Sequence, residues 1–351
     1  MSSRILVLNP GSTSTKIAVF EDESVSRSET LRHDAHFLQQ FPKIWDQFDF
    51  RLELVRKWAM TGSSRFDAVI SLGGLLKPVQ GGTYVVNAQM IVDARGNLQG
   101  EHASNLGCAL ADAIGHELGC PAFIADPVSV DEFEPLARYS GHPLLKRSSL
   151  SHALSIHAAA ARAAAEMNLT PSRASFIVAH LGGGISIAPV RGGRIIDVNN
   201  ASSDGPFSPE RTGGLPLQQF ITLCFSGAYT EQEMRKLVMG NGGLYAYLGT
   251  NSAMNVEERI ASGDSVASGA YEAMAYQIAK EIGAMAAVLK GNFQAIVLTG
   301  GLASSPLLIN WISDRIAFLG PVLVFQGEDE MRSLALAGLR VLRGDIQLLV
   351  Y

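Results

Sequence analysis

The chain has 351 residues, a formal net charge of −5 at pH 7, 47% hydrophobic residues and 17% charged residues. This length favours two domains with a cleft between them, and the composition excludes a disordered or coiled-coil chain in favour of an α/β enzyme. The mildly negative charge and the lack of a basic stretch interleaved with aromatic residues argue against nucleic acid as a partner.

The three cysteines, Cys108, Cys120 and Cys224, show no CxxC or metal-ligand spacing. A small, odd number of widely spaced cysteines favours reduced thiols and a cytoplasmic protein. The N-terminus lacks a basic region followed by an apolar run and a cleavage site, and no apolar stretch reaches the length of a membrane span. We therefore expect a soluble, cytoplasmic protein that does not bind a membrane.

The first feature along the chain is a hairpin. Two apolar runs, 5–8 and 17–20, indicate buried strands, and Pro10 and Gly11 mark a tight turn between them. The turn carries hydroxyl donors, backbone amides that can face an anion, a side-chain amide and a compact positive charge, which favours phosphate binding over a Ser/Thr-rich surface hairpin. The candidate phosphate-binding residues are Asn9, Ser12, Thr13, Ser14 and Lys16.

The rest of the first half alternates helices and strands. His33 and His36 lie in a polar stretch and are expected at the surface. Four glycines at positions 73, 74, 81 and 82 permit close approach of the backbone to a ligand, although a mobile turn is the alternative. Asp126 follows a predicted strand, at the position where α/β folds place chemistry. Helices are expected near 44–60 and up to about 118, and strands at 66–71 and 121–125.

The second half begins with a repeat of the opening hairpin. Residues 176–188 align with the first hairpin after a shift of 171 positions, which places His180 on Asn9 and Gly182 on Gly11. Duplication of a strand, a glycine-rich turn and a strand indicates two related domains that bind one nucleotide. Helices are expected up to about 167, at 265–290 and up to about 342, and strands at 295–299 and 322–325.

We place the domain boundary near residue 147. The predicted N-terminal domain spans 1–146, with the C-terminal segment 331–351 packed on it. The predicted C-terminal nucleotide-binding domain spans 147–330.

These motifs resemble the acetokinase branch of the sugar kinase, Hsp70 and actin superfamily, and within it the butyrate kinases. The resemblance covers essentially the whole chain and implies two duplicated α/β domains of the ribonuclease H-like type around a nucleotide cleft. The motifs that carry it are Asn9-Pro-Gly-Ser-Thr-Ser-Thr-Lys16, Gly73-Gly-Leu-Leu-Lys-Pro78, Gly82-Thr-Tyr84, His102-Ala-Ser-Asn-Leu106, Asp126-Pro-Val128, His152-Ala-Leu154, Gly205-Pro-Phe-Ser-Pro-Glu-Arg211 and Leu298-Thr-Gly-Gly301.

The resemblance implies reversible transfer of the γ-phosphoryl group of ATP to butanoate or a related short or branched-chain carboxylate, which gives ADP and an acyl phosphate. It further implies that His152 and His180 contact the phosphoryl group and that Arg211 stabilises transition-state charge. A structural histidine and a surface salt bridge are the plainer alternatives. The resemblance also fits a homo-oligomer formed through the second domain. Further nucleotide contacts are implied for Gly182, Gly183, Gly184, Gly300 and Gly301.

Magnesium is the implied cofactor. It would bridge the phosphates mostly through waters, because Mg²⁺ dehydrates reluctantly. The candidate ligands are Asn9, Asp126 and Glu330. For the acidic residues before the last helix, the alternative is a simple charge at the positive end of the helix dipole.

The chain departs from the family pattern where the acyl group would bind. Leu72 stands where an Arg normally precedes the Gly-Gly pair, so a cation that helps to bind the acyl or phosphoryl group is missing. Changes gathered at this end favour an altered carboxylate specificity over loss of ATP binding. The candidate acyl-pocket residues are Leu72, Gly73, Gly74, His102 and Asn105.

Two other functions remain open from the sequence. Leu72 and Ser151, which replaces the usual aromatic residue before the His-Ala-Leu motif, also fit a nucleotide-binding homologue whose catalysis has weakened. A superfamily kinase acting on a hydroxyl substrate would need a carboxylate base, which Asp126 could supply.

Overall fold

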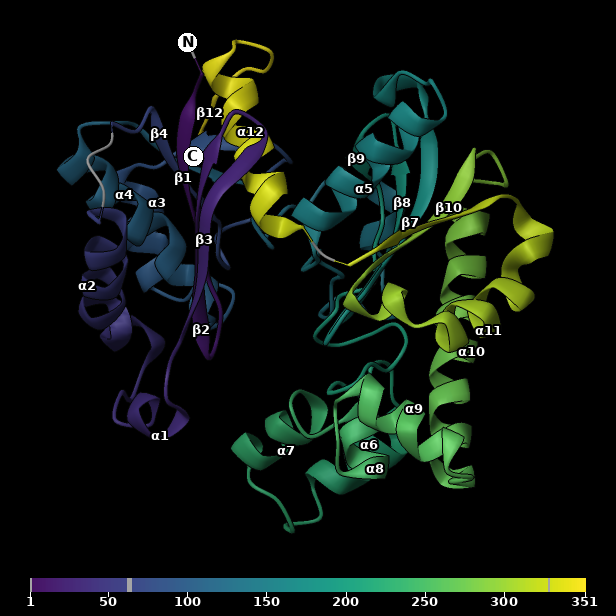
Figure 1. The fold of residues 1–351 in the computed structure, drawn as a ribbon. Coiled ribbons are helices and arrows are strands. Elements are labelled where there is room, and N and C mark those ends of the chain that lie inside the picture. Colours follow the sequence, from purple (N-terminus) through teal and green to yellow (C-terminus); the bar gives the residue numbers. More distant parts are fainter. Residues whose placement is uncertain (1, 62–64, 328) are drawn as a thin grey trace. The chain divides into compact units, whose positions relative to one another are not determined.

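A computed structural model describes residues 2–61, 65–327 and 329–351 of the chain (Figure 1). The chain divides into two compact α/β units, a first unit of residues 1–131 and 329–351 and a second unit of residues 132–328. The predicted boundaries at 146/147 and 330/331 differ from these limits, and the functional domains that they delimit stay a prediction.

The first unit is built on a seven-stranded sheet. Three neighbouring strands run parallel, and a meander continues from them with two antiparallel strands. The buried strands read as continuous apolar runs because both faces of the sheet are covered. In spatial order the strands are β12 (Leu349–Val350), β5 (Thr83–Val85), β6 (Ala122–Ala125), β4 (Ala68–Leu72), β1 (Arg4–Pro10), β2 (Ser14–Glu21) and β3 (Ser24–Arg32).

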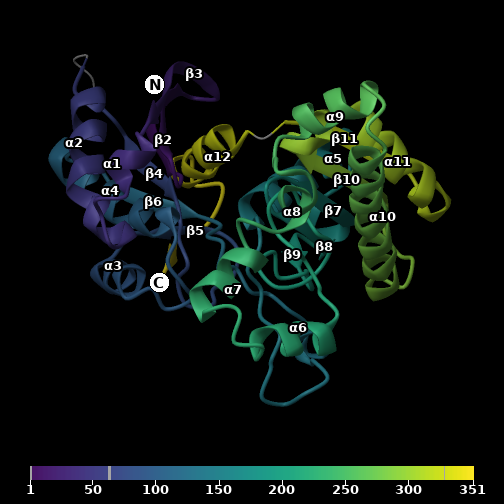
Figure 2. The ribbon, with the colours of Figure 1, turned by 90° about the horizontal axis from the view of Figure 1, so that it is seen from below.

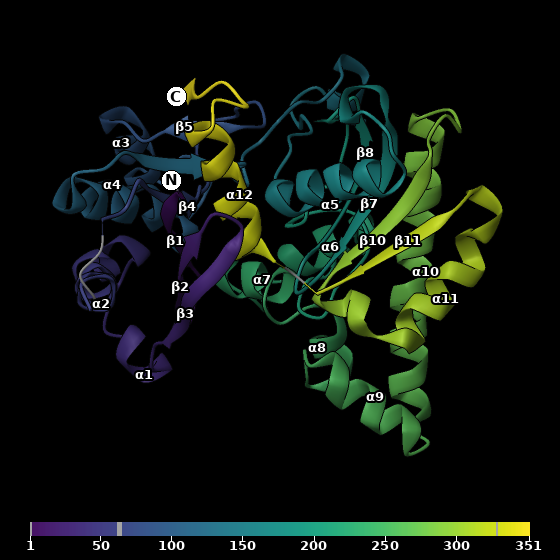
Figure 3. The same cartoon turned by 45° about the horizontal axis from the view of Figure 1, so that its top comes forward.

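Helices cover both faces of this sheet (Figure 3). On one face, Leu6 packs in a core with Leu52 of α2 (Phe48–Ala59) and Leu106 of α4 (Leu106–Leu118). Side chains alternate along a strand, so Ile5 faces the other way, toward Gly338 of α12 (Glu330–Leu342). Each fully buried Leu or Ile contributes about 1.5–3 kcal/mol. The remaining helices of this unit are α1 (Ala35–Leu38), η1 (Ile44–Gln47), α3 (Ala88–Arg95) and η2 (Ala103–Asn105).

The second unit is built on a five-stranded sheet. Its inner face packs on the long helix α10 (Ser265–Val288), whose Tyr271 and Ile278 are fully buried against Ile177 and Ile187. Asp264 caps this helix by accepting hydrogen bonds from two backbone amides of its first turn. Helix α5 (Ala153–Glu166) packs on two central strands of the sheet. In spatial order the strands are β11 (Val322–Gln326), β10 (Ala295–Gly300), β7 (Ser175–Leu181), β8 (Ile185–Arg191) and β9 (Arg194–Ile195).

Shorter helices complete the second unit (Figure 2). Among the described residues, no helix of the chain combines the length and the apolar character that crossing a membrane requires. The helices not yet introduced are η3 (Pro135–Arg138), η4 (Pro171–Arg173), α6 (Leu217–Cys224), α7 (Glu231–Val238), α8 (Gly243–Leu248), α9 (Ala253–Ala261), η5 (Gly301–Ser304), α11 (Pro306–Ile316) and η6 (Ala317–Leu319).

The predicted repeat of the hairpin is confirmed. β1 and β2 close on the pair Pro10 and Thr15, whereas β7 and β8 close on the pair Leu181 and Ile185. The two hairpins therefore match strand for strand, but the second turn is one residue shorter than the first.

Some elements are missing from the sequence expectations. β3 carries almost only exposed side chains and lacks the apolar alternation that indicates a strand. Helix α6 has apolar residues at helical spacing, namely Leu217, Phe220, Ile221 and Cys224, so the sequence could have indicated it although none of its residues is buried. The helix expected at 44–60 is a short 3-10 turn, η1, followed by α2.

The expectation that His33 lies at the surface is wrong. The residue is only 7% exposed, and its Nε2 lies 3.0 Å from the hydroxyl of Thr15. Burial and the nearby Arg51 guanidinium lower the pKa of His33 to about 4. His36 is exposed, as expected.

We predict that His33 makes the protein less stable as the pH falls from about 6.5 to about 4. Between these pH values His33 is protonated in the unfolded chain but stays neutral in the folded protein. Protonation therefore favours the unfolded chain and removes at most about 3 kcal/mol of stability. Melting temperatures across this range should fall less steeply for His33→Gln than for the wild type, while His36→Gln keeps the wild-type slope. Equal slopes for all three proteins would contradict a neutral, buried His33.

Candidate active site

The turn between β1 and β2 presents polar groups to solvent. Ser12 and Thr13 are exposed, and the turn is closed by a hydrogen bond from the Gly11 amide to the Ser14 carbonyl at 2.8 Å. Lys16 is also exposed and lies directly across the hairpin from Asn9. The five candidate phosphate-binding residues of this hairpin therefore lie together at one end of the sheet.

Arg51 lies beneath this turn. Its guanidinium donates to the carbonyl oxygens of Gly11, Ser12 and Ser14 at 2.8–3.2 Å, and also to the side-chain oxygen of Gln47. Arg51 has no solvent exposure, and burial lowers its pKa to about 10. A buried side chain from α2 thus fixes the backbone of the phosphate-binding turn.

The expected magnesium ligands Asn9 and Glu330 lie in direct contact. The Asn9 amide donates to a carboxylate oxygen of Glu330 at 2.7 Å, which joins the end of β1 to the first residue of α12. Asp329 caps that helix, accepting a hydrogen bond from the Arg332 amide at 2.9 Å. The pairing brings residues 321 positions apart into one polar group.

Asp126 lies at the end of β6 in a left-handed conformation, with φ of 37°. Asp is one of the few residues other than Gly that adopt this region. Its carboxylate accepts a hydrogen bond from the Gly82 amide at 2.7 Å. The glycine-rich loop and the strand end are therefore held together.

A metal site built only from protein ligands is absent from the part of the chain that the structure describes, since no three His, Cys, Asp or Glu side chains cluster suitably. An amide and separate carboxylates nevertheless offer the oxygen atoms that Mg²⁺ accepts directly or through water. Asn9, Asp126 and Glu330 therefore fit a largely hydrated Mg²⁺ ion, and their role as its ligands stays a prediction.

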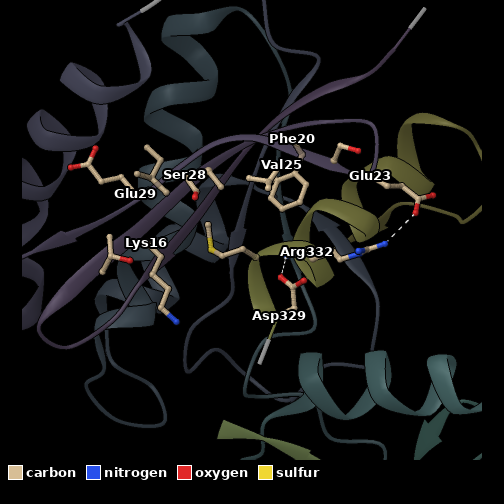
Figure 4. A pocket seen from close by; sticks show the side chains of 13 residues that line it. Lys16, Phe20, Glu23, Val25, Ser28, Glu29, Asp329 and Arg332 are labelled. Carbon is tan, nitrogen blue, oxygen red and sulfur yellow. Dashed lines mark hydrogen bonds and ion pairs between the residues drawn. The ribbon is translucent and has the colours of Figure 1, made fainter. Parts of the chain in front are cut away.

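A shallow pocket of about 760 Å³ lies over β2, β3 and the start of α12 (Figure 4). Lys16 lines it from β2, and Asp329 lines it from the start of α12. Arg332 and Glu23 form an ion pair at 3.6 Å along its edge. The pocket extends from the hairpin that carries the phosphate-binding candidates.

The acyl-pocket candidates gather where β4 ends. Leu72 is its last residue and is partly exposed, and Gly73 and Gly74 follow in buried positions. The buried Asn105 accepts from the Leu75 amide and donates to the Asn97 side chain and the Gly100 carbonyl. His102 is exposed and caps η2 through a contact with Ser104. Asn105 thus positions this loop, and the acyl-binding role of the whole group stays a prediction.

In the second unit, the two candidate catalytic histidines are stacked. The rings of His152 and His180 are 4.1 Å apart between centroids and 16° from parallel. His180 is buried near the end of β7, and His152 precedes α5. His152 Nδ1 lies 2.8 Å from the hydroxyl of Ser186, the residue that pairs with His180 across the hairpin.

Arg211 lies against the glycine turn of the second hairpin. A Cβ atom at Gly184 would lie only 2.5 Å from the Arg211 guanidinium, so only glycine leaves room for the arginine at this point. One guanidinium nitrogen donates to the Ala201 carbonyl at 2.9 Å, while Nε makes no hydrogen bond with any described residue. Burial lowers the pKa of Arg211, but an arginine stays charged at neutral pH.

The candidate nucleotide-binding glycines lie in two turns, one after β7 and one at the end of β10. Gly300, with φ of 94°, ends β10 so close to β7 that a side chain would meet the Leu181 backbone at 2.5 Å. Ser208 donates its hydroxyl to the Gly183 carbonyl at 2.5 Å, and the Gly182 amide bonds the Gly184 carbonyl. The second unit therefore groups His180, Arg211 and the candidate nucleotide-binding glycines around the strand ends.

Several supporting residues were not found from the sequence. Gln47 ends η1 and Arg51 lies in the first turn of α2, and no local sequence motif links either residue to the phosphate-binding turn. Ser186 and Ser208 contact candidate residues only through tertiary pairing. Asn199 crosses to β8, where its side chain bonds the backbone of Ile185 and Ile187.

Comparisons with known proteins give the family. A model of the acetokinase family matches residues 142–322. The chain is 51% identical over 344 residues to a probable butyrate kinase 2 of Caldanaerobacter subterraneus subsp. tengcongensis, covering 97% of both chains. It is 48% identical over 348 residues to butyrate kinase 2 of Clostridium acetobutylicum, covering 98% of both.

Solved structures agree on the fold. The acetate kinase of Porphyromonas gingivalis aligns with a TM-score of 0.79 at 19% identity, over 97% of this chain and 100% of that one. A propionate kinase of Francisella tularensis aligns with a TM-score of 0.73 at 19% identity, over 95% and 98%. These structures confirm the expected two-domain α/β fold. The carboxylate-kinase class is confirmed by the family model and by the identity to the butyrate kinases. On the evidence of its near-complete alignment to relatives at about half identity, the chain belongs to the acetokinase family.

Proposed function

We propose that the chain transfers the γ-phosphoryl group of ATP to butyrate or a related short or branched-chain carboxylate. The observation that carries this proposal is the identity of 48–51% to relatives named butyrate kinases, over almost the whole chain. The phosphate-binding candidates of the first unit and the His152, His180 and Arg211 group of the second supply the polar groups that such a transfer needs.

In the proposed reaction, a carboxylate oxygen forms a bond to the γ-phosphorus while the bond from that phosphorus to the β,γ-bridging oxygen breaks. ADP leaves with the electron pair, and no proton has to be removed from the attacking carboxylate. Catalysis therefore rests on alignment and on neutralising charge at the phosphoryl oxygens. This requirement suits a site rich in donors and without a dedicated base.

Each unit contributes donors to this task. The exposed amides and hydroxyls of Ser12 and Thr13, with Lys16, bind phosphate oxygens. His180 and His152 face the transferred phosphoryl group, with His152 oriented by Ser186. Arg211 offers its free Nε and part of its planar fork to the equatorial oxygens, where a donor has most effect in the transition state. Gly300 and Gly301 lie against the adenosine.

Asn9, Asp126 and Glu330 would hold Mg²⁺, partly through water. When bound, the ion neutralises phosphate charge and orients the β- and γ-phosphates. The hydrogen bond between Asn9 and Glu330 keeps both side chains at the end of β1, ready for a hydrated ion.

Leu72 distinguishes the acyl end of the site. An apolar side chain there suits an alkyl chain of four or five carbons, whereas an arginine would favour a smaller, more polar acid. One methylene contact changes specificity by about 1–3 kcal/mol, which sets the scale of the preference.

A homo-oligomer and a cytoplasmic location also belong to the proposal. Helix α6 and its C-terminal end expose Leu217, Ile221 and Phe225, the last at 86%, and such exposed apolar side chains favour association with another copy. None of the three cysteines forms a disulfide, which suits a reducing compartment.

The acid preference can be measured by trapping acyl phosphate with hydroxylamine. Purified protein with Mg-ATP is offered acetate, butyrate, isobutyrate, valerate or benzoate, and we expect most product with the four- and five-carbon acids. Glycerol and glucose serve as controls and should release no ADP above background. ADP release with the alcohols and none with butyrate would identify a hydroxyl kinase, and ATP binding without any product would identify a weakened homologue.

Arg211 can be tested with two variants. Arg211→Lys keeps a charge but loses the planar fork, and Gly184→Ala displaces the guanidinium; both should lower kcat by about 100-fold or more, with melting temperatures close to that of the wild type. Arg235→Lys, in an exposed ion pair with Glu231, is the matched control and should keep wild-type kcat. A kcat unchanged in both test variants would remove Arg211 from the catalytic group.

Leu72→Arg tests the acyl pocket. We expect the substitution to lower kcat/KM for butyrate by about tenfold while KM for Mg-ATP stays the same, because a charge replaces apolar contact with the alkyl chain. Initial rates across the same acids would reveal the change. A rise in turnover for every acid would instead mean that the missing cation limits the natural enzyme.

A further inference from the structure

Among the residues that the structure describes, Arg51 is the largest fully buried side chain. All its donors are used: Nε and Nη2 reach the Gln47 side-chain oxygen, and Nη1 and Nη2 reach carbonyl oxygens of the phosphate-binding turn. Nη1 also donates to the Thr15 hydroxyl at 3.1 Å. Every acceptor is a neutral oxygen.

No carboxylate neutralises this guanidinium among the residues that the structure describes. Burial is what lowers its pKa to about 10, and no neighbouring acid raises it again. The adjacent His33 is held neutral, with its pKa lowered by burial and by the Arg51 charge. Arg56, one and a half turns further along the same helix, shows the ordinary arrangement, because it pairs with Glu53 and Glu117 at the surface. Burying an unpaired cation costs free energy of folding, and a bound anion would offset that cost.

The peptide geometry shows where that anion would lie. In a trans peptide the N–H group points away from the preceding carbonyl. The carbonyls of Gly11 and Ser12 point inward to Arg51, so the amides of Ser12 and Thr13 point outward. Neither amide makes a hydrogen bond within the described part of the chain. Successive free amides on one face form an anion-binding nest.

We propose that Arg51 is the positioning residue of the phosphate-binding turn. It holds the carbonyls of Gly11, Ser12 and Ser14 on the inner side, which presents the amides of Ser12 and Thr13 to a phosphate, and its charge is balanced by that phosphate. The inference rests on the proposed function in that the phosphate belongs to ATP.

Gln47 provides a variant that separates charge from geometry. Gln47→Glu keeps the shape and both hydrogen bonds to Arg51, but it supplies the buried cation with a counter-charge. Arg51 should stay in place while its attraction for a phosphate falls. Arg51→Lys makes the complementary change, because it keeps the charge but cannot bond the five oxygens that Arg51 reaches.

The test measures Kd by calorimetry for Mg-ATP and for adenosine, without a carboxylate, together with the melting temperature. We expect Gln47→Glu and Arg51→Lys to weaken Mg-ATP binding by about tenfold while adenosine binding stays within about twofold of the wild type. Gln47→Glu should melt at or above the wild-type temperature. Arg56→Gln, on the same helix, is the matched control and should keep both Kd values.

Wild-type Kd for Mg-ATP in both test variants would overturn the role of Arg51. Equal losses of affinity for Mg-ATP and for adenosine would also overturn it. A purely structural role would weaken the phosphate contacts and the adenosine contacts to the same extent. Failure of the proposed function is distinguishable, since it leaves Mg-ATP binding intact and abolishes acyl phosphate formation in the wild type.

Discussion

A turn that binds phosphate through its amides must satisfy its own carbonyl groups elsewhere, and this requirement organises both hairpins. In the first unit the carbonyls turn inward onto the buried Arg51, which leaves the amides of Ser12 and Thr13 free. In the second unit, the Ser208 hydroxyl donates a hydrogen bond to the Gly183 carbonyl, and within the shorter turn the Gly182 amide donates to the Gly184 carbonyl. Related hairpins thus meet one constraint with different partners.

The same strand ends carry the side chains that the proposed reaction needs. Asn9 and His180 occupy equivalent positions, one residue before the end of β1 and β7. Asn9 donates a hydrogen bond to Glu330, a residue that follows the whole second unit in the sequence. His180 stacks on His152. Duplication therefore supplied a common frame, and divergence gave one copy a candidate metal-binding pair and the other a pair of imidazoles.

The two hairpins and the fold could be predicted from the sequence because they depend on local sequence signals. Apolar runs around Pro10 and Gly11, repeated near Gly182, indicate both hairpins, and the family motifs indicate the fold and the carboxylate-kinase class. The sequence could not predict Arg51, because in it a buried arginine of an amphipathic helix looks the same as the partly exposed Arg56 five residues later. It also misplaced His33, whose burial depends on the partner Thr15, 18 residues away. Tertiary polar contacts of this kind leave no periodic pattern in a single sequence.

The central claim is that a carboxylate oxygen of the substrate is the acceptor of the γ-phosphoryl group of ATP. Butyrate labelled with ¹⁸O in its carboxylate, incubated with the protein and Mg-ATP, tests it through the ³¹P NMR signal of the acyl phosphate formed. The account predicts a signal shifted by one ¹⁸O, because the carboxylate oxygen becomes the bridge between carbon and phosphorus. An acyl phosphate without the isotope shift, or labelled butyrate left unphosphorylated while ATP is consumed, would contradict transfer to the carboxylate.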